Sequence, residues 1–176
     1  MNKHGKTVSL IAAVYHDNVI GVGNKLPRHI PGELRGFKKQ TMGRDVIVGH
    51  RTFDSILQNT KGALLPGRHV IVLSSKSFPT RSRFTIARDP EDALRYARQS
   101  NEVFVAGGGK VYEAFLPFAD RMYLTHVNAT VENGQDKELV YFPKWNKEEW
   151  SVLPLGTYAA TADCPALERV ILERRV

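Results

Sequence analysis

The apolar runs in this chain are mostly continuous rather than alternating, and this limits the possible folds more than any other feature. Runs such as "VSLIAAV" (8–14) and "HVIVL" (69–73) contain almost no polar residue. Strands of this kind are usually buried on both faces, as in a parallel sheet with helices on each side. Eight segments are predicted as strands from their apolar and β-branched content, namely 8–14, 45–49, 69–73, 83–87, 102–106, 121–127, 150–158 and 167–174.

Helical patterns alternate with these strands, at 32–41, 52–59, 89–99 and 110–118. Thr52 is predicted as the N-cap of the second helix and Asp89 as that of the third, with Pro90 at its first position. Alternating strands and helices predict an α/β fold with right-handed crossovers. The last two strands have no helix between them, so we expect a hairpin and an antiparallel C-terminal strand.

The expected architecture is therefore three-layered, with a mostly parallel eight-stranded sheet flanked by helices. The 176 residues suit one domain, 1–176, because no linker or repeat divides them. Residues 128–149 lack clear periodicity, and we expect a long surface loop there.

Composition restricts the partners and the compartment. The net charge of +7 and the pI of about 9.6 favour anionic partners, such as a nucleotide. The basic residues are scattered without the aromatic pattern of a nucleic-acid-binding module, so we do not expect nucleic acid. The single cysteine, Cys164, excludes an internal disulfide and suits a cytoplasmic location. The chain has neither a membrane-length apolar stretch nor histidines at metal-ligand spacing.

Three consecutive glycines, Gly107–Gly109, stand between a predicted strand and a predicted helix. Glycine lets a backbone approach a ligand closely, and a helix N-terminus offers free N–H groups to a pyrophosphate. Open α/β sheets bind ligands at this end of their strands. The spacing matches neither GxGxxG nor a Walker loop, and a tight strand-to-helix turn is the alternative.

Polar residues follow two other predicted strands. His50, Arg51 and Thr52 would suit a phosphate monoester, or would form a solvated loop with a threonine cap. Ser74 and Ser75 would bind a second part of the same nucleotide. Arg68 has the planar fork that clamps a carboxylate, although a lone arginine at a strand start is more commonly solvated.

Glu33 allows two interpretations. It shares one face of the first predicted helix with Phe37 and Thr41. A carboxylate beside apolar side chains can relay a proton near neutral pH. An acid in a first helical turn is also favoured by the helix dipole alone, so the local pattern does not decide between the two.

Taken together, these segments resemble dihydrofolate reductase, from Val8 to Arg175. The matching segments, in chain order, are "VSLIAAVYHDNVIGVGNKLP", "FKKQT", "VIVGHRTFDSI", "LPGRHVIVLSS", "VFVAGGGKVYEAFLP", "YLTHV", "FP" and "RVILERR". Their order and spacing agree together, which is more specific than any single motif. The resemblance implies reduction of 7,8-dihydrofolate to 5,6,7,8-tetrahydrofolate with NADPH, in one-carbon metabolism, by a monomer.

The resemblance also implies roles for individual residues. Glu33 would be the catalytic carboxylate, which orients the pterin and assists protonation of its ring nitrogen. Arg68 would hold the carboxylate of the glutamate tail, and Thr125 would support Glu33. The remaining implied substrate-binding residues are Ile11, Leu26, Arg28, Leu34, Phe37, Ile56, Ala106 and Tyr112. The implied NADPH-binding residues are Ala13, Ile20, His50, Arg51, Thr52, Ser74, Ser75, Arg88, Gly107, Gly108, Gly109 and Val111.

The segment "GVGNKLP" (21–27) resembles the family's mobile lid over the nicotinamide, and two departures from the family follow it. Arg28 stands where the family usually has tryptophan, and Glu33 stands where many members have aspartate. The family's acidic loop is replaced by the longer "VENGQDKELVYFP", in which Asp136 is a candidate to pair with the lid. We expect these changes to alter antifolate binding, with trimethoprim resistance as one consequence.

Two alternatives remain at this point. One is a related pyrimidine or pteridine reductase with the same NADPH site, against which Arg68 argues, because such substrates lack a glutamate tail. The other is a non-catalytic folate or nucleotide binder, with Arg28 as the sign of lost chemistry. Retention of Glu33 argues against that binder.

Overall fold

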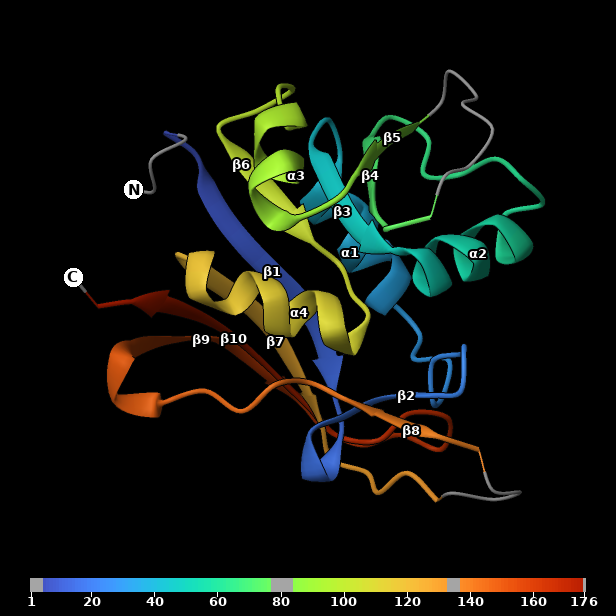
Figure 1. Ribbon diagram of the computed structural model, residues 1–176. Coiled ribbons are helices and arrows are strands. Elements are labelled where there is room, and N and C mark those ends of the chain that lie inside the picture. Colours follow the sequence, from blue (N-terminus) through green and yellow to red (C-terminus); the bar gives the residue numbers. More distant parts are fainter. Residues whose placement is uncertain (1–4, 77–83, 133–136, 176) are drawn as a thin grey trace.

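The computed structural model describes residues 5–76, 84–132 and 137–175, and its centre is an eight-stranded sheet (Figure 1). The strand order is β5-β4-β3-β6-β1-β7-β10-β9. The strands are β1 (Thr7–Val14), β3 (Asp45–Gly49), β4 (His69–Leu73), β5 (Phe84–Ala87), β6 (Glu102–Val105), β7 (Arg121–Val127), β9 (Trp150–Tyr158) and β10 (Leu167–Arg174).

Neighbouring strands from β5 to β7 are parallel, whereas β10 is antiparallel to both β7 and β9. The predicted α/β class and the antiparallel C-terminal strand are therefore confirmed. The eight predicted strands agree with these elements to within a residue, except that residue 83 lies outside the described residues.

Helices cover both faces of the sheet. Phe37 of α1 (Glu33–Thr41) and Phe53 of α2 (His50–Asn59) pack on one face. Leu94 of α3 (Pro90–Tyr96) and Phe115 of α4 (Gly109–Phe115) pack on the other, which faces the viewer in Figure 1. Short 3₁₀ helices are η1 (His16–Asn18), η2 (Leu116–Phe118) and η3 (Lys147–Glu149). Within the described residues, no helix is long and apolar enough to cross a membrane.

Three helix predictions were wrong at their ends. The predicted helix 110–118 is divided, because α4 ends at Phe115 and Leu116–Phe118 form η2. Helix α2 begins at His50 with the extended residue Gly49 as its N-cap, so Thr52 lies inside the first turn rather than at the cap. Strand β3 ends at Gly49 and α2 begins at the next residue, so the last residue of the strand is also the N-cap of the helix. Helix α3 stops at Tyr96, because the backbone of Ala97 is extended. Asp89 is confirmed as the cap of α3, since its carboxylate accepts from the Asp92 N–H at 2.8 Å.

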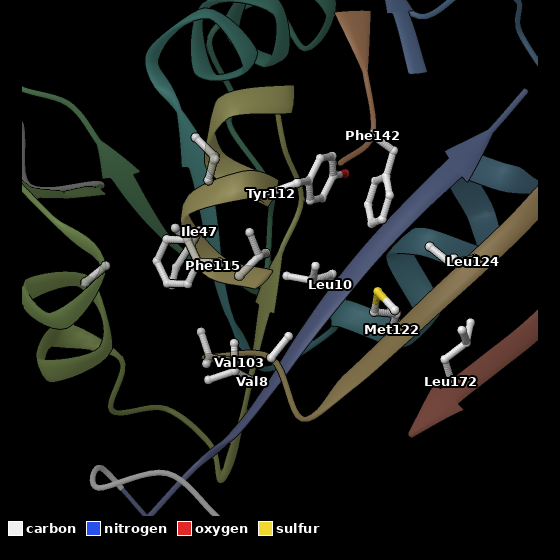
Figure 2. Close-up of a cluster of buried hydrophobic side chains, with 14 of the residues drawn as sticks. Val8, Leu10, Ile47, Val103, Tyr112, Phe115, Met122, Leu124, Phe142 and Leu172 are labelled. Carbon is white, nitrogen blue, oxygen red and sulfur yellow. The ribbon is translucent and has the colours of Figure 1, made fainter. Parts of the chain in front are cut away.

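Strand β1 runs through the middle of the core because its alternate side chains supply both faces. Val8 and Leu10 pack with Phe115 and Met122 under α4 (Figure 2). Ile11 packs on the opposite face, beneath α1 and α2. Burying an aliphatic side chain of this size contributes about 1.5–3 kcal/mol to folding. The apolar residues that predicted a doubly covered sheet therefore form the core on both of its faces.

The predicted surface loop at 128–149 was partly wrong, because it contains β8 (Leu139–Tyr141) and η3. Strand β8 pairs antiparallel with β2 (Val19–Val22) in a separate two-stranded sheet, which had no predicted counterpart. Strands of three and four residues are too short to show a periodic pattern. Their pairing ties the segment before α1 to the distant loop after β7.

Candidate active site

The polar residues singled out in the sequence follow strands that lie side by side. Gly49 pairs with Leu73, and Leu73 pairs with Ala87, at the carboxyl ends of β3, β4 and β5. The residues that come next in the chain therefore reach one edge of the sheet, and they are His50, Arg51, Thr52, Ser74, Ser75 and Arg88. This is the edge where open α/β sheets bind ligands.

The turn Gly107–Gly109 lies at the same edge, packed backbone to backbone. The N–H of Gly49 donates to the carbonyl of Gly107 at 2.7 Å. A Cβ on Gly109 would lie 2.8 Å from the Tyr141 carbonyl oxygen of β8. A Cβ on Gly108 would lie 3.5 Å from Oγ1 of Thr52, so the turn stands beside the first turn of α2.

This edge of the sheet carries three kinds of group that can bind the phosphates of a dinucleotide. Glycines leave the backbone of the turn bare, so its N–H groups can approach a pyrophosphate. Arg51 and Arg88 are exposed cations, and Thr52, Ser74 and Ser75 add hydroxyl groups. Cations and hydroxyl donors of this kind suit a phosphate monoester. The residues present fit a phosphorylated nucleotide cofactor.

Glu33 borders a hollow on the α1 face of the sheet. The lining residues are Ala13, Tyr15, Leu26, Pro27, Arg28, His29, Ile30, Glu33 and Leu34. Leu26 and Leu34 are 64% and 57% exposed, so the rim of the hollow presents apolar surface to solvent. The hollow is small, about 40 Å³, and its walls are mostly apolar. Small-molecule sites likewise have apolar walls with a few polar groups, although they are larger. The hollow includes five of the residues implied by the family resemblance, namely Ala13, Leu26, Arg28, Glu33 and Leu34.

The carboxylate of Glu33 is ion-paired rather than solvated. Nε and Nη2 of Arg169, on β10, both donate to its Oε1, the former at 3.1 Å. The two side chains are only 21% (Glu33) and 29% (Arg169) exposed. The carboxylate therefore has a side-chain partner in addition to its place in the first turn of α1. No side-chain hydrogen bond joins Thr125 to Glu33 in the part of the chain that the structure describes.

Arg68 lies against the other end of α1. Its Nη1 donates to Oγ1 of Thr41 at 3.3 Å, and its guanidinium lies 6.0 Å from the ring centroid of Phe37. Burial lowers the pKa of Arg68. The predicted common face of Glu33, Phe37 and Thr41 thus carries a carboxylate at one end and Arg68 at the other.

The apolar residues implied for the substrate pocket pack against one core cluster. Ile11, Phe37, Ile56 and Ala106 are partly buried against the same core cluster, on the face covered by α1 and α2. Thr125 faces the same side, since it pairs with Ala13 of β1. Ile20 and Val111, implied for the cofactor, lie in the cluster on the opposite face.

Tyr112 joins the two groups of residues. Its hydroxyl donates to the carbonyl of Ile11 at 2.7 Å, and its ring lies 3.1 Å from where a Cβ on Gly107 would stand. Burial raises the pKa of Tyr112 well above its ordinary value. This hydroxyl stays protonated and is committed to a backbone carbonyl.

Arg28 and the lid segment lie at the rim of the hollow. Arg28 lines the hollow, and its Nη2 donates to the carbonyl of Asp163 at 3.4 Å. The lid turns tightly, with the Val22 N–H donating to the carbonyl of Lys25 at 2.9 Å. The Gly23 N–H donates to the carbonyl of Glu138, which attaches the lid to the β8 segment by its backbone. Asp136 lies outside the described residues.

Arg169 and Tyr15 have no counterpart among the site residues expected from the sequence. Arg169 lies within "LERVILER", where the alternation of a strand gives no sign that one charged side chain points to α1. Tyr15 follows β1 directly, and its position at a strand end was the available signal. Across the described ranges, no group of three or more metal-ligating side chains occurs.

Comparisons with known proteins identify the family of the chain. A model of the dihydrofolate reductase family matches residues 7–165. Dihydrofolate reductase type 3 of Salmonella typhimurium is 37% identical over 169 residues, covering 96% of this chain and 98% of that protein. The dihydrofolate reductase of Haemophilus influenzae is also 37% identical, over 83% of this chain and 84% of its own. A structure of Enterococcus faecalis dihydrofolate reductase, complexed with NADP(H) and RAB-propyl, superposes with a TM-score of 0.82 at 23% identity, over 98% of each chain.

Proposed function

The chain belongs to the dihydrofolate reductase family, and from this premise we propose that Glu33 is the catalytic carboxylate of its active site. The protein is an NADPH-dependent oxidoreductase that reduces 7,8-dihydrofolate to 5,6,7,8-tetrahydrofolate. The observation that carries the proposal for Glu33 is its position. It is a half-buried carboxylate on the wall of an apolar hollow, on the helix face that leads to Arg68.

The spacing of the two charges suits the substrate. Thr41, which contacts Arg68, is eight residues beyond Glu33, or about 12 Å along the helix at 1.5 Å per residue. Dihydrofolate carries a polar pterin at one end and the carboxylates of its glutamate at the other. We place the pterin at Glu33, the aminobenzoyl ring against Phe37 and Ile56, and a tail carboxylate at Arg68. A planar guanidinium fork holds a carboxylate by two parallel hydrogen bonds.

The reaction adds a hydride to carbon and a proton to nitrogen of one C=N bond in the pterin. NADPH, when bound, supplies the hydride. In our proposal the Glu33 carboxylate accepts hydrogen bonds from the pterin amino group and ring N–H, and so fixes the ring for proton delivery to its nitrogen. The Tyr112 hydroxyl is not the proton source, because its hydrogen bond is used by the carbonyl of Ile11.

Residues at the carboxyl edge of the sheet would hold NADPH. The bare backbone of Gly107, Gly108 and Gly109 would receive the pyrophosphate, beside Val111. The adenosine end and its 2′-phosphate would lie among His50, Arg51, Thr52, Ser74, Ser75 and Arg88, and the nicotinamide near Ala13 and Ile20. The proximity of Gly108 to Thr52 supports a continuous binding strip.

We propose that residues 1–176 form one domain, which is supported by the single main sheet to which both ends of the described chain contribute. We also propose a cytoplasmic monomer whose partners are the small-molecule substrate and cofactor, without nucleic acid.

The test follows NADPH consumption with dihydrofolate across pH for the parent and for Glu33→Gln. Glutamine keeps the shape of glutamate, but it is neutral and one of its two terminal atoms is a donor instead of an acceptor. We therefore expect kcat/KM at pH 7 to fall by about 10²–10⁴-fold. Glu33→Asp is the matched control, and it should retain most of the activity. A glutamine variant within about threefold of the parent would contradict the role of Glu33.

A further inference from the structure

Arg169 reaches Glu33 from the opposite end of the chain, 136 residues away. The pairing of strands β1, β7 and β10 beneath α1 explains how the two side chains meet. Ala13 of β1 pairs with Thr125 of β7, and Thr125 pairs with Arg169 of β10. Paired residues in neighbouring strands project to the same face, so the three side chains form a row across the sheet. The Arg169 end of that row meets the first turn of α1.

The guanidinium of Arg169 is itself held in place. It lies over the ring of Tyr158, on β9, with its Cζ 5.0 Å from the ring centroid. Burial alone would lower the pKa of Arg169, but the hydrogen bonds and charge of Glu33, together with the smaller contribution of Tyr158, outweigh burial, and the net shift of this pKa is upward. Arg169 is therefore a fixed cation at every pH where the enzyme would work.

The geometry of the pair leaves one carboxylate oxygen for a ligand. Both donors of Arg169 end at Oε1 of Glu33, and none of the hydrogen bonds among the described residues ends at Oε2. Arg169 lines the hollow on the outer side of α1, whereas Glu33 lines the hollow that we assign to the pterin. The ion pair thus separates the two hollows.

We propose that Arg169 is the positioning residue of Glu33, anchoring Oε1 from behind so that Oε2 is presented to the substrate as an anion. This rests on the proposed role of Glu33. Glutamate has one more rotatable bond than the aspartate found in many relatives, and an unanchored glutamate would spread over several rotamers. Two hydrogen bonds from a planar fork remove that freedom.

Other charged or titratable groups surround the pair and have to be considered in any pH experiment. Tyr15 lies in the same hollow, and burial followed by the nearby Glu33 charge raises its pKa, while Arg28 lowers it. The others lining the two hollows are Arg28, His29, Arg35, Lys39, Tyr158 and Cys164. Only Arg169 donates a side-chain hydrogen bond to Glu33 among the described residues.

The test measures the pH profile of hydride transfer in single turnovers for the parent, Arg169→Met and Arg169→Lys. Because the reaction consumes a proton, the rate falls as pH rises. The consumed proton enters at the pterin held by the Glu33 carboxylate. Loss of the Arg169 cation favours the state in which this pterin–carboxylate pair has gained the proton, so in Arg169→Met the falling limb should move up by about one pH unit. The plateau at low pH should drop about tenfold, because the carboxylate is no longer fixed. Arg169→Lys keeps the charge, and its limb should stay within about 0.3 pH units of the parent.

Two controls separate positioning from general damage. Arg35→Met removes an exposed cation from the same outer hollow, and it should change neither limb nor plateau. In a Glu33→Gln background, Arg169→Met should change the rate less than about twofold, because its effect passes through Glu33. The NADPH dissociation constant of each variant, measured by fluorescence, reports whether the fold is intact.

The outcomes are distinct for the two proposals. An unmoved limb in Arg169→Met, or an equal loss in the Glu33→Gln background, would overturn the positioning role. A Glu33→Gln variant with parental turnover would instead overturn the role of Glu33 itself, whatever Arg169 does. If Arg169→Met fails to fold, Arg169→Gln takes its place. Glutamine removes the charge but keeps a polar side chain, so its falling limb should also move up by about one pH unit, and an unmoved limb would overturn the positioning role.

Discussion

The hydroxyl of Tyr112 donates a 2.7 Å hydrogen bond to the carbonyl of Ile11, which connects α4 to β1 across the centre of the site. Tyr112 also packs against Phe142, with ring centroids 4.9 Å apart. One buried side chain therefore touches the glycine turn proposed for NADPH, the strand proposed for the pterin and the segment that follows β8. Substrate side and cofactor side are fixed relative to each other by this contact.

Tyr112→Phe tests the contact through stability. The substitution leaves the Ile11 carbonyl without its side-chain donor in a buried place, which costs about 1–3 kcal/mol. We expect the free energy of unfolding, from urea titration at pH 7, to fall by that amount. A change below about 0.5 kcal/mol would mean that water or a neighbour replaces the hydroxyl.

The same residue predicts an alkaline stability profile. Burial raises the pKa of Tyr112 above its ordinary value of 10.0, so the folded state keeps a proton that the unfolded state loses. Its contribution to stability is complete below pH 10 and is lost as the pH rises above it. The parent should lose about 1.4 kcal/mol more per pH unit than Tyr112→Phe above pH 10. Parallel curves for the two proteins would contradict this.

Arg68 predicts a separation of KM from kcat. Its contacts with Thr41 and Phe37 place it beyond the hollow at Glu33, where it should bind the substrate tail without touching the reacting atoms. Arg68→Met should raise the KM for dihydrofolate by about 10–100-fold, with kcat within twofold. A dihydropterin without the glutamate tail is the control substrate, and its KM should not change.

Gly109 and Gly36 form a matched pair for the cofactor site. A Cβ at Gly109 meets the Tyr141 carbonyl at 2.8 Å, and backbone cannot yield as a flexible side chain can. Gly109→Ala should displace β8 and weaken NADPH binding about tenfold, as measured by fluorescence titration. A Cβ at Gly36, inside α1, meets nothing within 4 Å. Gly36→Ala should leave NADPH binding unchanged and stabilise the protein by about 0.5–1 kcal/mol.

The sheet was predictable because its signal is local. Runs such as 45–49 and 69–73 are apolar along their whole length, and any short β-branched run of this kind has to be buried on both faces. Strand β8 escaped prediction because three residues carry no period, and its pairing with β2 joins segments more than a hundred residues apart. Pairing over such distances depends on the complete fold.

The residues proposed for the site could be chosen from the sequence, but the ion pair between Glu33 and Arg169 could not. Glu33, Arg68 and the glycine turn were recognised because the order of segments along the whole chain resembles one family. Arg169 was not, because its partner is set by register: the pairing of Thr125 with Arg169 decides which β10 side chains face α1. A shift of one residue in that register would turn Arg169 to the other face and bring Val170 beneath the helix.

Asp45 carries the last prediction, because its surroundings imitate a catalytic arrangement. Its buried carboxylate bonds Nδ1 of His69 at 2.7 Å, while Nε2 of the same ring lies 2.8 Å from Oγ1 of Thr85. An acid, a histidine and a hydroxyl in line suggest a nucleophilic triad. They stand at or near the amino ends of β3, β4 and β5, at the edge opposite the glycine turn.

The second carboxylate oxygen of Asp45 accepts from the Gln99 N–H at 2.7 Å, so the group ties three strands to the chain that follows α3. Its work is structural, and the reductase should not need it for chemistry. Asp45→Asn should lower the free energy of unfolding by about 2–4 kcal/mol, since a buried charge-assisted contact is lost. kcat at a temperature where the variant is folded should stay within twofold of the parent. Lost turnover in a variant of parental stability would show instead that this edge takes part in the reaction.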